Sequence, residues 1–161
     1  MCSQGIEEES ARIYFQALSL MVPKDFGFNG RNKRPPRDPF NAVLSLGYTI
    51  LASECTFTCM EHGLDPYISF LHELDFGRES LSCDLVEPFR TEIDKFSLNL
   101  FLEKKLTVHN FSTTEQGCFM NKEGRTIFYP AFEKLRGGLR KRISNYLLEI
   151  IHGMESASQG A

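Results

Sequence analysis

The sequence predicts an all-α fold, a helical bundle arranged around one long apolar helix. The central observation is a segment apolar on nearly all sides, DPFNAVLSLGYTILASECTFTCMEHG, residues 38–63. Asp38 is a favourable N-cap residue, Pro39 suits the first helical position, and Gly63 suits the stop. Apolar residues recur at helical spacing on both sides of this segment, and strand-like patterns are few.

The elements before residue 125 follow from periodicity and from residues that break helices. A first helix is expected over about residues 6–21, and Pro23 and a Gly/Asn-rich linker end it. A short element is expected at 64–74, followed by a third long helix over about 81–105, which Pro88 shortens or kinks. Residues 110–124 are rich in Thr, Ser and Gly and are expected to form a loop or a small hairpin.

The C-terminal part predicts two helices divided by Gly137 and Gly138. The second helix is expected to stop at Gly153, which leaves residues 154–161 as a disordered tail after one domain over 1–153. Its apolar face carries Leu139, Ile143, Leu147 and Ile150.

Composition limits the possible function classes. A chain of 161 residues is long enough for one domain with a real core, and a net charge of −3 confines any nucleic-acid surface to a local patch. No apolar run reaches the roughly 18 residues that a membrane span needs. No signal peptide is visible, because the first apolar stretch carries three glutamates and Arg12. Five cysteines without a CxxC pair favour a reducing cytoplasm.

Three glutamates at the start of the first helix point in different directions. On a helical wheel Glu8 and Glu9 fall on or beside the polar face, whereas Glu7 falls on the apolar stripe. A carboxylate on that stripe needs a partner or a metal, because an unpaired buried charge is costly. The alternative is that Glu7, near a frayed chain end, turns to solvent. The other members of the stripe are Ala11, Tyr14, Leu18 and Met21.

Other polar groups interrupt apolar segments in the same way. His72 lies within YISFLHEL, and Asp84 and Glu87 stand three residues apart in LSCDLVEPF, so they share a helix face. The structural alternatives are a hydrogen-bonded core histidine and an acidic cluster at a helix start. Glu54, on the apolar stripe of the second helix, is a candidate partner for an arginine, and Arg90 is one candidate.

One imidazole with several carboxylates is a set of mostly hard oxygen ligands, which suits Mg²⁺ or Mn²⁺. These ions polarise phosphoryl oxygens and activate a hydroxyl group, so the set predicts phosphodiester chemistry. A zinc site at Cys55, Cys59 and His62 is the less favoured alternative, since its spacing fits no strong pattern.

Two basic clusters are candidates for contacts with phosphates, and a solvated surface is the alternative for each. The first cluster lies in the linker and consists of Arg31, Lys33, Arg34 and Arg37. Arg78 and Arg90, near the acidic residues in the sequence, are further candidates. The second cluster is Lys134, Arg136, Arg140, Lys141 and Arg142.

Four ordered blocks resemble the CRISPR-associated integrase family, Cas-one, the DNA-inserting subunit of CRISPR adaptation. They are GIEEESARIYF, NKRPPRDPFNAVLSLGYTIL, GLDPYISFLHE and GRESLSCDLVEPFR, and FSTTEQGCFMNKEGRTIF fits a weaker C-terminal pattern. The resemblance spans roughly residues 5–153. It implies that the chain is the α-helical catalytic domain of that family.

The resemblance also implies a site and a reaction. Glu7, His72 and Glu87 stand at the positions that bind a divalent metal in the family, and Asp84 is a further acidic member of the site. The implied reaction is a transesterification that inserts new DNA at the CRISPR repeat, with cleavage of double-stranded or branched DNA as a related activity. The implied partners are DNA, a second copy in a homodimer, and a small ferredoxin-like subunit.

The chain departs from the family pattern at two positions and in one domain. Glu8 and Ser69 replace glycines, and Glu8 adds negative charge beside Glu7. The family's N-terminal β-strand domain is absent from the given sequence. Two alternatives to an active enzyme therefore stand: a catalytically silent DNA-binding or assembly domain, and a purely structural helical fragment.

Overall fold

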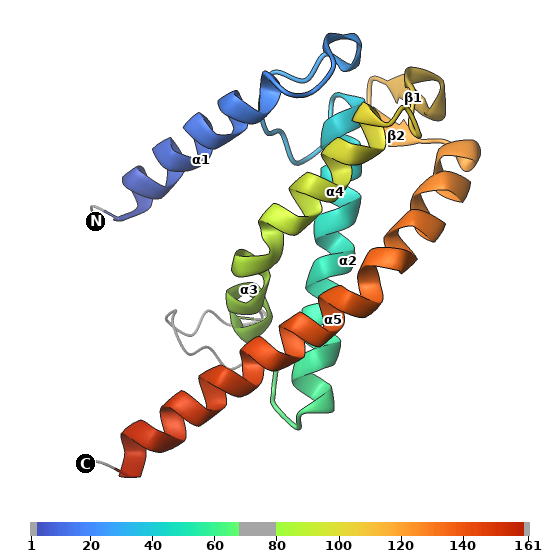
Figure 1. The fold of residues 1–161 in the computed structure, drawn as a ribbon. Helices are drawn as coiled ribbons and strands as arrows, with labels where there is room; N and C mark the ends of the chain where they lie inside the picture. Colours follow the sequence, from blue (N-terminus) through green and yellow to red (C-terminus); the bar gives the residue numbers. More distant parts are fainter. Residues whose placement is uncertain (1–2, 68–79, 160–161) are drawn as a thin grey trace. The chain divides into compact units, whose positions relative to one another are not determined.

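The structure, a computed structural model, describes residues 3–67 and 80–159, without the side chains of 3–8, 80, 154, 155 and 157–159. The described part is mainly helical, with one small hairpin, so the all-α expectation is confirmed (Figure 1). The helices are α1 (Ser3–Ser19), α2 (Pro39–Glu61), α3 (Ser80–Val86), α4 (Arg90–Leu102) and α5 (Lys122–Gln159). Three short 3-10 turns are η1 (Lys24–Phe26), η2 (Glu87–Phe89) and η3 (Val108–Asn110), and the strands are β1 (Phe111–Thr114) and β2 (Gly117–Met120).

The chain divides into two compact units, and three helices continue from one into the other. The first unit comprises Met1–Gly47 and Ile93–Tyr129, and the second comprises Tyr48–Glu92 and Pro130–Ala161. Helices α2, α4 and α5 each contribute residues to both units. The expectation of one domain over 1–153 with a tail after it stays a prediction.

The ends of α2 lie where the local sequence predicts them. Asp38 caps the start, because its Oδ1 accepts a hydrogen bond from the backbone N–H of Asn41 at 2.8 Å. Gly63 has φ of +72°, and the N–H of Leu64 reaches back to the carbonyl of Cys59 at 2.9 Å. This is a Schellman ending, in which a left-handed residue closes the last turn.

Helix α2 is long and apolar enough to cross a membrane by length and composition alone, the one such helix in the described residues. The expectation that no apolar stretch reaches this length is therefore corrected. A buried core helix passes the same test, and Val43, Leu51 and Cys55 are fully buried. The feature is weak evidence for a membrane.

The hairpin of the first unit is fixed to the linker before α2. Strands β1 and β2 pair antiparallel, with Phe111 opposite Met120, which confirms the small hairpin expected at 110–124. The N–H of Cys118 donates to the carbonyl of Pro36 at 2.7 Å. Gly117 has φ of +130°, and a Cβ there would lie 2.8 Å from Pro35 Cβ, so only glycine allows this approach.

The segment that follows residue 80 is interrupted at Pro88, as predicted. Helix α3 ends at Val86, η2 contains Pro88, and α4 begins at Arg90. Proline lacks an N–H and crowds the preceding turn, which converts one helical turn to 3-10 geometry.

The C-terminal prediction of two helices is wrong, because α5 is continuous from Lys122 to Gln159. Neither the Gly137–Gly138 pair nor Pro130 ends it, and it also passes Gly153. Tertiary packing outweighs the low helix propensity of glycine here. Three residues of the predicted apolar face, Leu139, Ile143 and Leu147, are fully buried.

Candidate metal and nucleic-acid site

The proposed metal ligands are only partly described. The backbone at Glu7 is helical, but its side chain lies outside the described residues, as do His72 and Arg78. Glu7 belongs to the first unit, whereas Asp84 on α3 and Glu87 on η2 belong to the second. The metal-ligand set therefore stays a prediction.

Glu87 is the best-described candidate ligand. Its side chain is 61% exposed, and Arg90 Nη2 lies 2.8 Å from its Oε1. The Arg90 guanidinium also lies over the ring of Tyr48, 5.5 Å from the centroid. An exposed ion pair between residues one helical turn apart contributes at most about 1 kcal/mol. The pair with Arg90 is therefore too weak to prevent Glu87 from binding a cation. The donors of Glu87 and the half-buried Asp84 are carboxylate oxygens, which fit Mg²⁺ or Mn²⁺.

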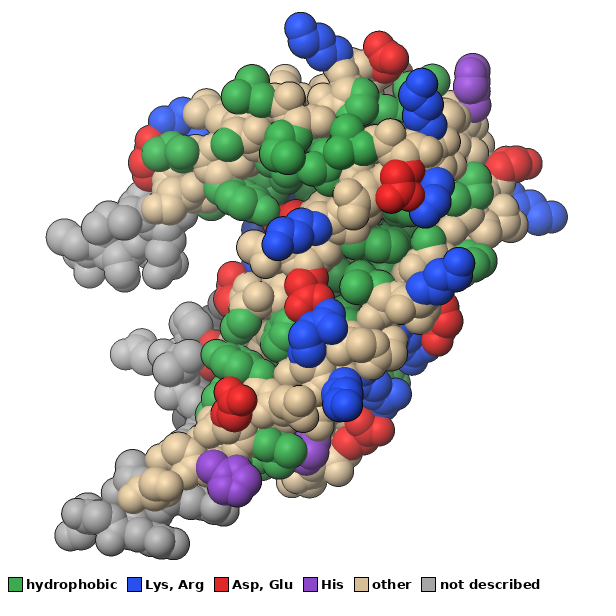
Figure 2. Space-filling model, in the orientation of Figure 1, with side chains coloured by type: hydrophobic (Ala, Val, Ile, Leu, Met, Phe, Trp, Pro, Cys, Tyr) green, Lys and Arg blue, Asp and Glu red, His purple; other side chains and the backbone are tan. Residues whose placement is uncertain are grey.

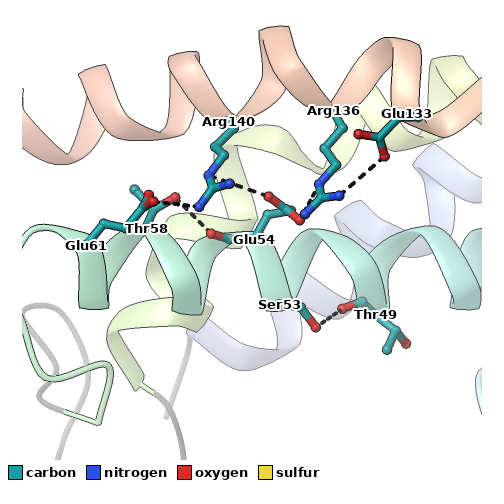
Figure 3. A network of polar contacts seen from close by, with 8 residues as sticks. All are labelled: Thr49, Ser53, Glu54, Thr58, Glu61, Glu133, Arg136 and Arg140. Carbon is teal, nitrogen blue, oxygen red and sulfur yellow. Dashed lines mark hydrogen bonds and ion pairs between the residues drawn. The ribbon is translucent and has the colours of Figure 1, made fainter.

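Glu54 has an arginine partner, but the expected partner, Arg90, is wrong. Arg136 Nε donates to Glu54 Oε1 at 2.8 Å, and Arg140 Nε lies 3.9 Å from Oε2 (Figure 3). Glu54 is only 3% exposed, so its charge is compensated by α5 inside the second unit. The sequence suggests an arginine as a partner of Glu54, but it does not identify Arg136, which is 82 residues away.

The arginines of α5 form further pairs with acids. Arg136 also donates to Glu133, and hydrogen bonding to Glu133 and the charge of Glu54 raise the pKa of Arg136. Arg140 Nη2 donates to Glu61 Oε1 at 2.7 Å (Figure 3). Arg142 pairs with Glu92, and basic and acidic side chains are interspersed along α5 in Figure 2. Within the described part of the chain, these three arginines support the structural interpretation of the second basic cluster.

In the linker, one of the four expected phosphate-binding residues has a structural role. Arg31 donates to Asn41 Oδ1 at 2.8 Å and to Ser45 Oγ at 3.1 Å. Asn41 is fully buried and also donates to Asp38 Oδ2 at 2.6 Å, so Arg31 belongs to the network at the start of α2. The exposed members are Lys33, Arg34 and Arg37, and the described residues give their side chains no ion-pair partner.

The alternative zinc site is not formed. Among the described residues no three His, Cys, Asp or Glu side chains converge as a metal would require. Cys55 is fully buried, and burial, with nearby thiol and carboxyl groups, raises its pKa to about 12, which disfavours the thiolate that zinc needs. His62 Nε2 instead shares a hydrogen bond of 2.8 Å with Ser144 Oγ.

Helix α1 differs from its predicted amphipathic pattern. Leu18 is buried, as the stripe predicts, but Ala11 and Met21 are exposed. Tyr14 Oη donates to Asp94 Oδ2 at 2.7 Å, and burial together with Asp94 raises the pKa of the Tyr14 hydroxyl, which keeps it protonated as a donor. Hydrophobic side chains are visible at the surface along α1 (Figure 2).

Sequence reasoning missed the contact between Tyr14 and Asp94. The available signal was a helical wheel of residues 90–102, on which Asp94 falls between Leu98 and Phe101 on the buried face. A carboxylate in that position indicates a buried hydrogen-bond partner.

The fold and the arrangement of these groups can be compared with known proteins. The family model described as CRISPR associated protein Cas1 matches residues 3–134. The chain belongs to the Cas1 family. A CRISPR-associated endonuclease Cas1 of Thermus thermophilus is 41% identical over 146 residues, which cover 90% of this chain and 43% of the relative. A second, from Thermodesulfovibrio yellowstonii, is 45% identical over 133 residues, which cover 81% of this chain and 42% of the relative.

Solved Cas1 structures agree with the fold. The Cas1 protein of Thermotoga maritima is 29% identical and superposes with a TM-score of 0.82 over 91% of this chain and 49% of its own. A casposase bound to integration product, also 29% identical, gives a TM-score of 0.73 over 81% of this chain and 38% of its own. The chain spans about two fifths of the length of the curated Cas1 relatives that it matches.

Proposed function

We propose that this chain is the helical catalytic domain of a metal-dependent DNA endonuclease and integrase of CRISPR adaptation. Membership of the Cas1 family carries the proposal, because the family model covers the segments that hold all four candidate site residues. Relatives over 40% identical are named CRISPR-associated endonucleases, and a structural neighbour is titled as bound to integration product. The proposed location is the cytoplasm.

The proposed ligands of Mg²⁺ or Mn²⁺ are Glu7, His72 and Glu87, with Asp84 in support. When bound, the ion supplies a Lewis acid that polarises a phosphodiester and stabilises the charge that develops on its oxygens. The exposed carboxylate of Glu87 is accessible to a cation, and Arg90 beside it adds a positive charge that can pair with a DNA phosphate. Asp84, half-buried on α3, adds negative charge that favours cation binding.

The proposed substrate is double-stranded or branched DNA at a CRISPR repeat. Lys33, Arg34 and Arg37 are exposed and can contact phosphates, whereas Arg31 acts by shaping the linker. The proposed partners are a second copy of the chain and a small ferredoxin-like subunit, and the support for both is the family resemblance.

Replacement of the proposed ligands tests the function. Glu87→Gln and Glu7→Gln are expected to lower Mn²⁺-dependent cleavage of branched DNA by more than the about 10- to 100-fold that loss of an outer-shell group causes. Glu149→Gln, an exposed carboxyl of the second unit, is the matched control and is expected to keep the parent rate. Unchanged cleavage by both ligand variants would reject the assignment.

The second candidate is a DNA-binding or assembly domain without catalysis. Its support is the exposed linker group Lys33, Arg34 and Arg37, which can contact DNA phosphates without a metal. DNA binding by the chain without turnover, across titrations of Mg²⁺ and Mn²⁺, would establish it. A chain with neither property would be a structural fragment.

A further inference from the structure

We infer that Phe119 and Pro35 form an apolar surface, the base platform, on which one unpaired base of the bound DNA stacks. Arg34 and Arg37, which flank Pro35 and Pro36 in the chain, bind the phosphates next to that base. The inference deepens the proposed function, since it takes DNA as the substrate. It lies entirely within the first unit, which contains both the linker and the hairpin.

Phe119 is a large aromatic residue on the solvent side of β2. Its neighbours Cys118 and Met120 are buried, whereas Phe119 is 47% exposed, which is the alternation expected of a strand with one solvated face. The residue opposite it on β1 is Ser112, which is too small to cover a phenyl ring. Among the described residues, no other aromatic ring packs against Phe119. The ring is therefore open to a planar ligand.

The Phe119 ring lies beside the two prolines of the linker. A Cβ built on Gly117 would lie 2.8 Å from Pro35 Cβ and 3.4 Å from Phe119 Cζ, so these two atoms lie close to one point. Pro35 is exposed, as Phe119 is. The phenyl ring supplies a face on which any base can stack, and the proline extends the apolar surface around it.

Hydrogen bonds on both sides hold the linker backbone in place at the base platform. From β2, the N–H of Cys118 donates to the carbonyl of Pro36 at 2.7 Å. From the linker itself, the N–H of Arg37 donates to Asn32 Oδ1 at 2.8 Å, and the N–H of Asn32 donates to Oδ1 of the buried Asn41 at 3.0 Å. Because the backbone is already ordered, DNA binding costs less conformational entropy than it would on a loose loop.

The charges around the base platform favour a nucleic acid as its occupant. Arg34 and Arg37 flank the prolines, Lys33 precedes them, and all three side chains are exposed. The hairpin, residues 111–120, carries a single acid, Glu115. Proteins that bind single strands combine cations, which track the phosphates, with aromatic rings, which stack on the bases. An apolar protein partner would instead have to cover three charged groups, which costs free energy.

A base can reach Phe119 only where it is unpaired. In a duplex each base is paired and stacked between its neighbours, so its faces are not accessible, and taking it out of the stack costs free energy. An unpaired end or branch presents the face of a base without that cost. The base platform therefore narrows the proposed substrate to DNA with an unpaired segment.

The decisive experiment measures dissociation constants of the 161-residue chain by fluorescence anisotropy, in EDTA so that neither metal nor cleavage contributes. One probe is a duplex with a short single-stranded extension, and the other carries abasic nucleotides in the extension, which keeps the phosphates and removes the bases. Phe119→Ala is expected to weaken binding of the first probe about fivefold or more, as loss of one stacked base does, and to leave the abasic probe unchanged. The matched control is Tyr129→Ala, which removes a half-exposed ring of the same unit and is expected to leave both constants unchanged.

The absence of tryptophan from the sequence allows a direct optical test. Phe119→Trp places a single indole at the base platform, and stacking against a base quenches indole fluorescence. The emission is expected to fall when the extended probe binds and to stay constant with the abasic probe. Tyr129→Trp is the matched control and is expected to keep its emission with both probes. This readout keeps a ring at position 119 and so does not depend on how well Phe119→Ala folds.

The outcomes distinguish the inference from the proposed function. If Phe119→Ala binds the extended probe as the parent does, or weakens binding of the abasic probe equally, the stacking role is wrong and DNA as the substrate stands. If the parent binds neither probe, the proposed substrate fails and the base platform fails with it. Loss of self-association by Phe119→Ala in sedimentation, with DNA binding unchanged, would show that the ring contacts protein and would also overturn the inference.

Discussion

Glu54 places a negative charge in a nearly dry part of the second unit and depends on α5 for its compensation. Glu54 is 3% exposed, while the side chain of Arg136 is 39% exposed, so water can solvate the Arg136 guanidinium when Glu54 is absent. Removing either partner therefore has a different effect on stability. Loss of the arginine leaves a buried negative charge without compensation, whereas loss of the carboxylate leaves an arginine that solvent stabilises.

This inequality predicts the effect of Arg136→Met, which keeps the apolar stem and removes the charge. The free energy of unfolding is expected to fall by about 2–4 kcal/mol, since Arg140 at 3.9 Å compensates only in part. Arg142→Met, which breaks a more exposed pair with Glu92, is the matched control and is expected to cost at most about 1 kcal/mol. Urea unfolding measures both, and equal losses would show that burial of Glu54 does not determine the cost.

For single residues, the sequence indicates which polar side chains are buried and require a partner more reliably than it indicates which residue that partner is. Glu54 is identified by its place on an apolar stripe, which is a local property. Arg136 follows 82 residues later, and only the folded chain brings it within reach of Glu54. Arg31 shows a role that its charge alone does not predict, because it donates hydrogen bonds to Asn41 and Ser45, while its contact with phosphate stays a prediction.

At the scale of elements, the two glycines of interest in α2 and α5 have opposite meanings. Gly63 has φ of +72° at the end of α2, a conformation that a side chain disfavours. Gly137 lies inside α5, and a Cβ built there meets no heavy atom within 4 Å. Glycine therefore ends α2 at position 63, whereas at position 137 it lies within α5 without ending the helix.

This contrast predicts opposite signs for two alanine substitutions. Gly137→Ala is expected to raise the free energy of unfolding by about 0.5–1 kcal/mol, because alanine loses less backbone entropy in a helix. Gly63→Ala is expected to lower it by about 1–2 kcal/mol, because alanine in a left-handed conformation is strained. Thermal and urea unfolding measure both. Destabilisation by Gly137→Ala would mean that α5 breaks at the Gly137–Gly138 pair, as the sequence alone suggests.

Element ends can be predicted where local chemistry determines them. Asp38, Gly63 and Pro88 each act through a cap, a left-handed turn or a missing N–H, and their predicted effects are all found. The prediction of two helices fails because buried residues pack on both sides of the glycines, Phe132 before them and Leu139 and Ile143 after them. Two of the predicted ligands, Glu7 and His72, have side chains outside the described residues, so the sequence identifies the members of the candidate site by motif and leaves their geometry open.

At the scale of the whole molecule, the positions of the charged residues say more about DNA binding than the net charge does. The chain has 18 basic and 21 acidic residues, and this net charge of −3 argues neither for nor against DNA binding. Three arginines of α5 are paired with glutamates, so they add little to an external field. Lys33, Arg34 and Arg37 remain as a dense, exposed group within five residues of the linker.

This distribution predicts how DNA binding responds to salt. Each neutralised phosphate contributes about 0.9 to the slope of log K against log salt concentration on duplex DNA. Simultaneous replacement of Lys33, Arg34 and Arg37 by alanine is therefore expected to make the slope less steep by about 2–3, as measured by fluorescence anisotropy over a KCl series. The charge-matched control replaces Lys24, Lys95 and Lys122, three exposed lysines of the same unit, and is expected to change the slope by less than about 1. If both triple variants change it equally, DNA responds to the net charge of the molecule and the linker is not its binding surface.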